Sequence, residues 1–146
     1  MRTGQGFMLV FSLTDRYTFD ELAQFAEQIS RVKDKNVSDV PIVVVGNKSD
    51  LVHERQVTTN EALAFAKSIN APYIETSAKL RFNIDECFHE TVREIKKDIE
   101  RRNAPNNNKK TVTTTNNNNN NNNNTLQKKK KAKNPVARFL KKIFVR

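Results

Sequence analysis

The feature that most constrains the fold is a run of branched apolar residues, Ile-Val-Val-Val at 42–45, set between Pro41 and Gly46. The run lacks the alternation of a half-exposed strand, so it predicts a parallel strand that is covered on both faces. Proline is tolerated at the first residue of such a strand. Parallel neighbours are joined by crossover connections, usually helices, so the run predicts helical segments on either side of it.

Helical periodicity is present in three segments, at 18–33, 58–69 and 83–99. The first two open with Thr-x-x-Glu, which is the form of a capping box. The third opens with Asn-Ile-Asp-Glu. Apolar residues recur along one face of each predicted helix. In chain order they are Phe19, Leu22, Ala26, Ile29 and Val32, then Ala62, Leu63, Phe65, Ala66 and Ile69, then Ile84, Phe88, Val92, Ile95 and Ile99.

The short apolar run at 7–11 predicts a strand. The segment Tyr-Ile-Glu-Thr at 73–76 predicts another short strand. The resulting order is strand, helix, strand, helix, strand, helix. That order is typical of a parallel α/β sheet with right-handed crossovers. The single cysteine, Cys87, lies in the third predicted helix, and we interpret it as a small core residue.

Charge and composition divide the chain into three parts. The formal net charge is +10, but all 16 acidic residues lie within residues 1–102, which we predict to be the α/β domain. Residues 103–127 are rich in asparagine. Such a tract buries too little apolar area to offset its ordering entropy, so we expect a disordered linker there. Residues 128–146 form a polybasic tail.

The tail combines basic and apolar residues at amphipathic spacing. The apolar ones are Val136, Phe139, Leu140, Ile143 and Phe144. We expect residues 128–146 to form a short basic helix that binds an anionic membrane surface. RNA binding, a partner helix and a merely solvated lysine-rich tail are the alternatives.

Two polar loops follow the second and third predicted strands, and the first of them is Asn47-Lys48-Ser49-Asp50. Ligands of open parallel sheets sit beyond the carboxyl ends of the strands. The Asp50 carboxylate can accept from both N–H groups of guanine at once, whereas adenine lacks that donor pair. Asn47 can fix the loop and reach the imidazole side of the base, and Lys48 can lay its methylenes along the base plane.

The second loop is Ser77-Ala78-Lys79, directly after Glu75-Thr76. Ser77 can buttress the carboxylate of the first loop, the Ala78 backbone N–H can donate to the keto oxygen of guanine, and Lys79 can cover the other face of the base. Taken alone, Asn-Lys-x-Asp more often marks a polar turn after a strand. Its place after an apolar strand, with Ser-Ala-Lys after the next strand, favours a base-binding site.

With these loops the chain resembles the Ras superfamily of small GTPases, and within it the Ras and Rap branch. The resemblance covers about residues 1–102. It rests on Met-Arg-Thr-Gly-Gln-Gly-Phe at 1–7, Gly-Asn-Lys-Ser-Asp-Leu at 46–51, Glu-Thr-Ser-Ala-Lys at 75–79 and Arg-Glu-Ile at 93–95. It implies that the three strands are the last three of six, which is the C-terminal half of a doubly wound, mainly parallel sheet of the P-loop NTPase type.

Several elements of that family are absent from the 146 residues. They are the phosphate-binding Gly-x-x-x-x-Gly-Lys-Ser/Thr, the Asp-x-x-Gly that senses the γ-phosphate, and the water-orienting glutamine. Met1 matches an internal position of the family, so we expect a parent protein with roughly 70 further residues upstream. The first strand should then have an open apolar edge, and the last helix should lose part of its packing surface.

The resemblance implies a signal-transduction switch that binds GTP and GDP and, with Mg²⁺ in a complete domain, hydrolyses GTP. It also implies exchange factors, GTPase-activating proteins and effectors as partners. We expect weak or no nucleotide binding by this chain alone. The C-terminus lacks the prenylation motif, so attachment to the inner face of the plasma membrane from the cytoplasm would depend on the tail. The alternatives are a truncated, non-catalytic interaction remnant and a tail-driven lipid- or RNA-binding protein.

Overall fold

The computed structural model describes residues 2–104 of the chain. The polybasic tail and nearly all of the predicted linker lie outside the described residues. Strands β1 (Phe7–Ser12), β2 (Ile42–Asn47) and β3 (Tyr73–Glu75) form a parallel sheet in the order β1-β2-β3. The α/β class and the parallel sheet are therefore confirmed.

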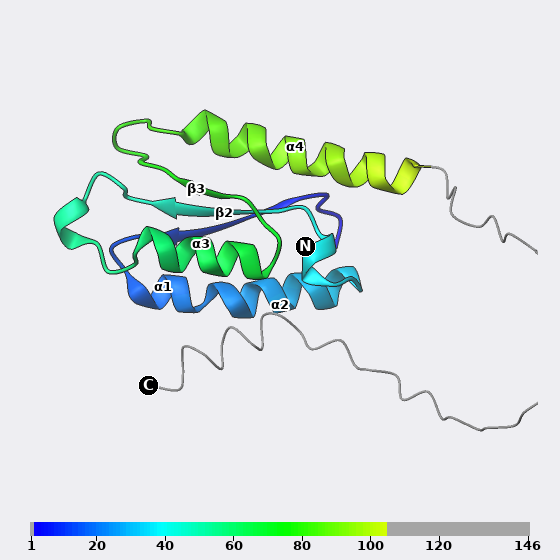
Figure 1. Cartoon of the computed structure of the whole chain (residues 1–146), viewed down its shortest axis with the longest axis horizontal. Helices are drawn as coiled ribbons and strands as arrows, with labels where there is room; N and C mark the ends of the chain where they lie inside the picture. Colours follow the sequence, from blue (N-terminus) through cyan, green and yellow to red (C-terminus); the bar gives the residue numbers. More distant parts are fainter. Residues whose placement is uncertain (1, 105–146) are drawn as a thin grey trace, which may run out of the picture.

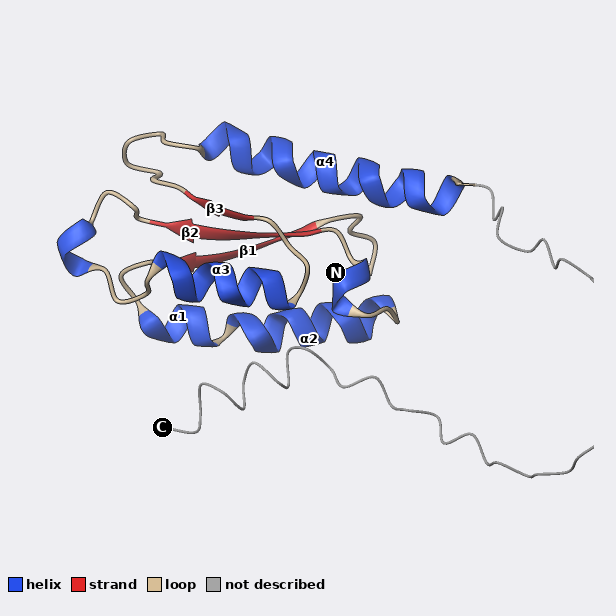
Figure 2. Cartoon of the chain, viewed as in Figure 1, coloured by secondary structure: helices blue, strands red, loops and turns tan. Residues whose placement is uncertain are grey.

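Helices cover the sheet on both faces (Figures 1 and 2). Those on one face are α1 (Arg16–Asp20), α2 (Leu22–Lys33) and α3 (Thr59–Ser68), and α4 (Ile84–Asn103) lies on the other. Two short 3-10 turns, η1 (Val37–Asp39) and η2 (Val52–Glu54), lie in the connections. Within residues 2–104, no helix combines the length and apolar character needed to cross a membrane.

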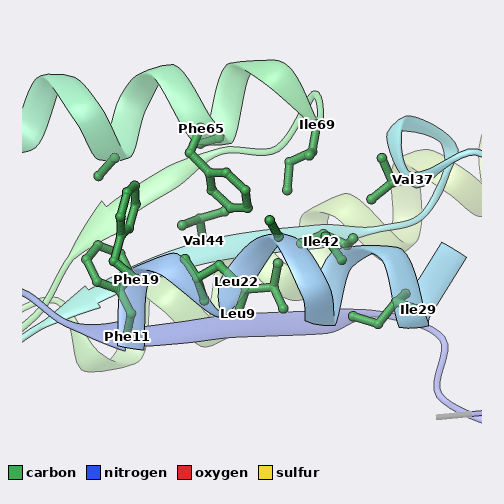
Figure 3. Packing of buried hydrophobic residues seen from close by; sticks show 14 of the residues in the cluster. Leu9, Phe11, Phe19, Leu22, Ile29, Val37, Ile42, Val44, Phe65 and Ile69 are labelled. Atoms are coloured by element: carbon green, nitrogen blue, oxygen red, sulfur yellow. The ribbon is translucent and has the colours of Figure 1, made fainter. Parts of the chain in front are cut away.

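The central strand β2 belongs to two cores at once, because successive side chains of a strand point to opposite faces. Ile42 and Val44 belong to the larger cluster under α1, α2 and α3, which Figure 3 shows. Val43 and Val45 pack in a smaller cluster with Cys87 of α4. This explains why the 42–45 run is apolar at every position, and it places Cys87 in the core as predicted.

The predicted first helix is two segments, and its predicted start was wrong. The N-cap is Asp15, whose carboxylate accepts from the Tyr17 backbone N–H at 3.0 Å. Thr18 lies inside α1 and does not cap a helix: its hydroxyl donates to the Asp15 carbonyl at 2.8 Å and accepts from the Ser12 N–H at 3.0 Å. Because that hydroxyl ties α1 to the end of β1, it is not available to form the predicted capping box.

The second predicted capping box is confirmed. The Thr58 hydroxyl accepts from the Glu61 backbone N–H at 3.3 Å, and the Glu61 carboxylate accepts from the Thr58 N–H at 3.0 Å. Glu61 also meets Arg16 of α1 at 2.7 Å, so this carboxylate joins α3 to α1. The Arg16 hydrogen bond and the bonds from Thr58 hold the pKa of Glu61 at about 2, below its ordinary value of 4.5.

We expect the free energy of unfolding to decrease at acidic pH, because Glu61 becomes protonated there. Its contribution is fully present above the unfolded-state pKa of 4.5 and is lost as the pH falls toward about 2. The side chain is 41% exposed, so solvent screening keeps the expected loss at about 1 kcal/mol or less. Urea unfolding at about pH 7 and pH 3 measures it. The Glu61→Gln variant should lose less free energy of unfolding between about pH 7 and pH 3 than the unchanged chain. The control Glu54→Gln should lose as much as the unchanged chain, and equal losses in all three proteins would contradict the assignment to Glu61.

Within residues 2–104, only part of the apolar stripe predicted for α4 is packed against other residues. Ile95 packs so closely on the start of β1 that a Cβ on Gly6 would lie 2.6 Å from it. By contrast, Phe88 and Val92 are exposed, as is Val10 on β1. The open edge and the reduced packing surface expected from the sequence are thus present within residues 2–104.

Candidate functional site

The two predicted loops lie side by side at the carboxyl edge of the sheet. Strands β2 and β3 are paired neighbours, with Gly46 opposite Glu75. Beyond them, the Thr76 N–H donates to the Gly46 carbonyl at 2.8 Å, and the Ser49 N–H donates to the Thr76 carbonyl at 3.0 Å. Backbone hydrogen bonds therefore continue past the last ladder pair and hold the two loops together.

Asn47 ties the two loops with one side-chain oxygen. Its Oδ1 accepts from the Lys48 N–H at 2.8 Å and from the Ala78 N–H at 3.2 Å. Lys48 adopts a left-handed backbone with φ of 67°, and the first of these bonds supports that conformation. The structure thus places the Ala78 amide, predicted to donate to a keto oxygen, against Asn47.

Asp50 and Ser77 meet as the sequence predicted. The Ser77 hydroxyl donates to Asp50 Oδ1 at 2.5 Å, and its oxygen accepts from the Leu80 N–H at 3.1 Å. Ser77 is fully buried, so these bonds satisfy a hydroxyl that water does not reach. Its hydroxyl fixes the carboxylate in one orientation.

The electrostatics of the loops keep Asp50 charged. The Ser77 hydrogen bond lowers the pKa of Asp50, and so do its own backbone N–H and the nearby ammonium groups of Lys79 and Lys48. Both lysines are exposed. The arrangement is an oriented carboxylate flanked by two long cationic side chains, which suits a planar ligand that presents adjacent N–H donors.

Sequence reasoning missed a polar cluster beneath the loops. Arg55 makes a bidentate pair with Glu75, at 3.0 and 2.8 Å. The same carboxylate accepts from the Thr59 hydroxyl at 2.8 Å and the Tyr73 hydroxyl at 2.9 Å, and the Glu75 carbonyl accepts from Asn83 Nδ2 at 2.9 Å. The available signal was a glutamate at the end of a short strand, directly before the second loop.

The Arg55 pair lowers the pKa of Glu75, and burial followed by the Glu75 hydrogen bond raises the pKa of Tyr73. A charged glutamate and a neutral tyrosine are therefore stable together here. Glu75 lies directly before Thr76 and the second loop, and Arg55 follows η2, which comes after the first loop. The ion pair therefore connects the segments that flank the two loops.

The fold and these loops define a parallel α/β protein whose candidate ligand site lies where such sheets bind ligands, at the strand ends. The Ras family matches residues 1–97. The chain is 55% identical over 100 residues to Ras-like protein rasB of Dictyostelium discoideum, which covers 68% of the chain and 50% of that relative. It is 50% identical over 106 residues to Ras-like protein 1 of Saccharomyces cerevisiae, which covers 73% of the chain and 34% of the relative.

A third relative, Ras-like protein 2 of Drosophila melanogaster, is 50% identical over 97 residues, which are 66% of this chain and 50% of that protein. The chain therefore belongs to the Ras family, the Ras-like small GTPases. It spans between about a third and a half of the length of these curated relatives.

Proposed function

We propose that this chain recognises the guanine base through Asn47, Lys48, Asp50, Ser77, Ala78 and Lys79. The observation that carries the proposal is the Asp50 carboxylate, kept charged and oriented by Ser77 at 2.5 Å. One lone pair of Asp50 is used by Ser77, and the carboxylate has further acceptor sites for the ring N–H and exocyclic amine of guanine. Adenine offers no such donor pair and would leave the carboxylate unpaired.

The remaining residues have supporting roles in this proposal. The stems of Lys48 and Lys79 lie along the two faces of the base. Asn47 holds the loops at the spacing the base needs through its bond to the Ala78 amide. That amide turns to the keto oxygen, or shares its hydrogen between the two acceptors, when the base is present.

In the complete Ras-type protein we propose that these loops serve a GTP/GDP switch, with Mg²⁺, exchange factors, GTPase-activating proteins and effectors as family relationship suggests. Mg²⁺ would there neutralise charge on the phosphates. Among residues 2–104, no three His, Cys, Asp or Glu side chains gather to hold a metal ion, and we assign no Mg²⁺ ligand to them. Residues 103–127 would act as a linker, and residues 128–146 would bind an anionic membrane surface from the cytoplasm.

A titration with GMP and AMP, followed by NMR of the backbone amides, tests base recognition. We expect GMP to shift the amide signals of Lys48 and Ala78 with a dissociation constant of about 1 mM or weaker, since base contacts alone supply little affinity. AMP should leave both signals in place. Equal responses to the two nucleotides would sink the assignment, and micromolar GDP binding by calorimetry would contradict reliance on base contacts alone. No response to either would favour a non-catalytic interaction remnant.

A further inference from the structure

Helix α4 carries a line of apolar side chains that residues 2–104 leave partly uncovered. We define the exposed stripe as Phe88, Val92, Ile95 and Ile99. Phe88, Val92 and Ile99 are 54%, 48% and 38% exposed. The four positions recur every three or four residues, so they form one row along the helix. Single exposed apolar residues are ordinary, but a continuous row indicates a surface that binds another apolar surface.

The exposed stripe lies on a different side of α4 from the residues that meet the sheet. The buried residues of this helix are Cys87 and Asp98. Phe88 and Ile99 each follow one of them by one position, which turns them about 100° around the helix. Ile95 reaches the glycine directly before β1. Among the described elements, α4 is the one helix on this face of the sheet (Figure 2), so the stripe has no helical neighbour there.

The charges along α4 restrict what can pack on the stripe. Its first turn contains Asp85 and Glu86, and its last turn contains Arg101 and Arg102. A parallel helix with the same charge pattern would set acids against acids and bases against bases. An antiparallel helix brings opposite charges together at both ends and also opposes the helix dipoles favourably. The stripe therefore suits an antiparallel helix with an apolar row, an acidic start and a basic end.

A second copy of α4 has these properties and fits in register. A twofold axis midway along the stripe sets Phe88 opposite Ile99 of the other copy, because the two positions are equally far from the middle. Asp85 and Arg102 are also equally far from it, so they face each other at both ends of the contact. Arg102 pairs with Asp98 at 2.9 Å, but its side chain is 55% exposed and has further N–H donors. Such a contact is closed by its symmetry.

We propose that two copies of this chain associate through antiparallel α4 helices, with the exposed stripe of each packed on the other. The contact is made by side chains and leaves the backbone edge of β1 unpaired. Helix α4 begins beside the second loop, where Asn83 donates to the Glu75 carbonyl at 2.9 Å. Antiparallel helices therefore place the two candidate base sites at opposite ends of the dimer. The contact is short, so we expect a dissociation constant of about 10–100 µM.

Sedimentation equilibrium of the full chain, from about 5 to 500 µM, tests the association. The variant Phe88→Glu places a charge in the apolar row and should weaken the dimer about tenfold or more. Its matched control is Phe25→Glu, the same change at an exposed phenylalanine of α2, which should associate as the unchanged chain does. Circular dichroism should show both variants folded.

A mixing experiment tests the antiparallel arrangement. The variants Asp85→Lys and Arg102→Glu each set like charges opposite one another when they associate with themselves. A mixture of the two variants restores an opposite-charge pair at each end, so it should associate about threefold or more tightly than either variant alone. In the control mixture, Glu86→Lys replaces Asp85→Lys. Glu86 lies about 100° further around the helix, so this mixture should show no such gain.

The outcomes decide between the possible occupants of the stripe. A chain that stays monomeric over the whole concentration range would overturn the inference and leave the stripe to another segment or another protein. Association that persists in Phe88→Glu would place the contact elsewhere and overturn it too. Equal association of the mixture and the separate variants would overturn the antiparallel arrangement. None of these results depends on the response to GMP, which measures base recognition by itself.

Discussion

An Asp50→Asn variant is expected to keep its fold and lose its response to GMP. The amide retains an oxygen that can accept the Ser77 hydroxyl, which lies 2.5 Å from the present carboxylate, so the buried serine stays satisfied. The other oxygen becomes an NH₂ group that faces the two N–H donors of guanine. Hydrogen bonds to charged groups are worth about 1.5–3 kcal/mol, so GMP binding should weaken about tenfold or more.

The measurement is the amide titration with GMP, extended to xanthosine monophosphate. Xanthine carries an oxygen where guanine carries its amine, and the NH₂ group of the Asp50→Asn variant can donate to that oxygen. The variant should therefore bind xanthosine monophosphate more tightly than the unchanged chain does. Glu54→Gln, which removes a nearby exposed carboxylate, serves as the control and should respond to GMP normally. An Asp50→Asn variant that retains full GMP shifts would show that this carboxylate does not read the base.

Phe65→Ala should produce the largest loss of stability of any single change considered for this domain. Phe65 of α3 is 1% exposed and packs edge-on against Phe19 of α1, with ring centres 5.9 Å apart (Figure 3). Truncation leaves a cavity where α1, α3 and the sheet meet, and such changes cost about 3–5 kcal/mol. Domains of this kind are stable by about 5–15 kcal/mol, so the variant would approach the limit of folding at room temperature.

Urea unfolding followed by circular dichroism measures this loss. Phe25→Ala is the matched control, because Phe25 of α2 is exposed and its truncation leaves no cavity. We expect its cost to stay near 1 kcal/mol. Equal losses in the two variants would mean that the cluster under α1, α2 and α3 is not the dominant core.

The sheet and the pairing of the loops were predictable because their signals are local. The run at 42–45 is apolar at every position, and a strand with that pattern fits only where both faces are covered, as β2 is. Two neighbouring parallel strands then bring the residues after them to one edge. The contact between Asp50 and Ser77 follows from that topology rather than from the residues taken singly.

What escaped prediction depends on hydrogen bonds that join one element to another. Thr18 opens a segment with the pattern of a helix cap, but its hydroxyl accepts a hydrogen bond from the Ser12 N–H at the end of β1. Arg55 and Glu75 are 20 positions apart, and no periodicity links them until β3 and the η2 connection are placed together. In both cases the hydrogen bonds between elements select one side-chain arrangement from several that the local sequence allows.

The unpaired edge of β1 makes the lifetime of the folded domain depend on the protein concentration. Within residues 2–104, β1 pairs with β2 alone, and Val10 stands exposed on it. Unpaired strand edges are templates on which other chains add. Such additions increase with protein concentration, whereas the unfolding of a single molecule does not. A dilute sample should therefore lose folded protein mainly by unfolding, and a concentrated sample mainly by aggregation at this edge. A charged residue in place of Val10 would then extend the lifetime of the folded protein in the concentrated sample only.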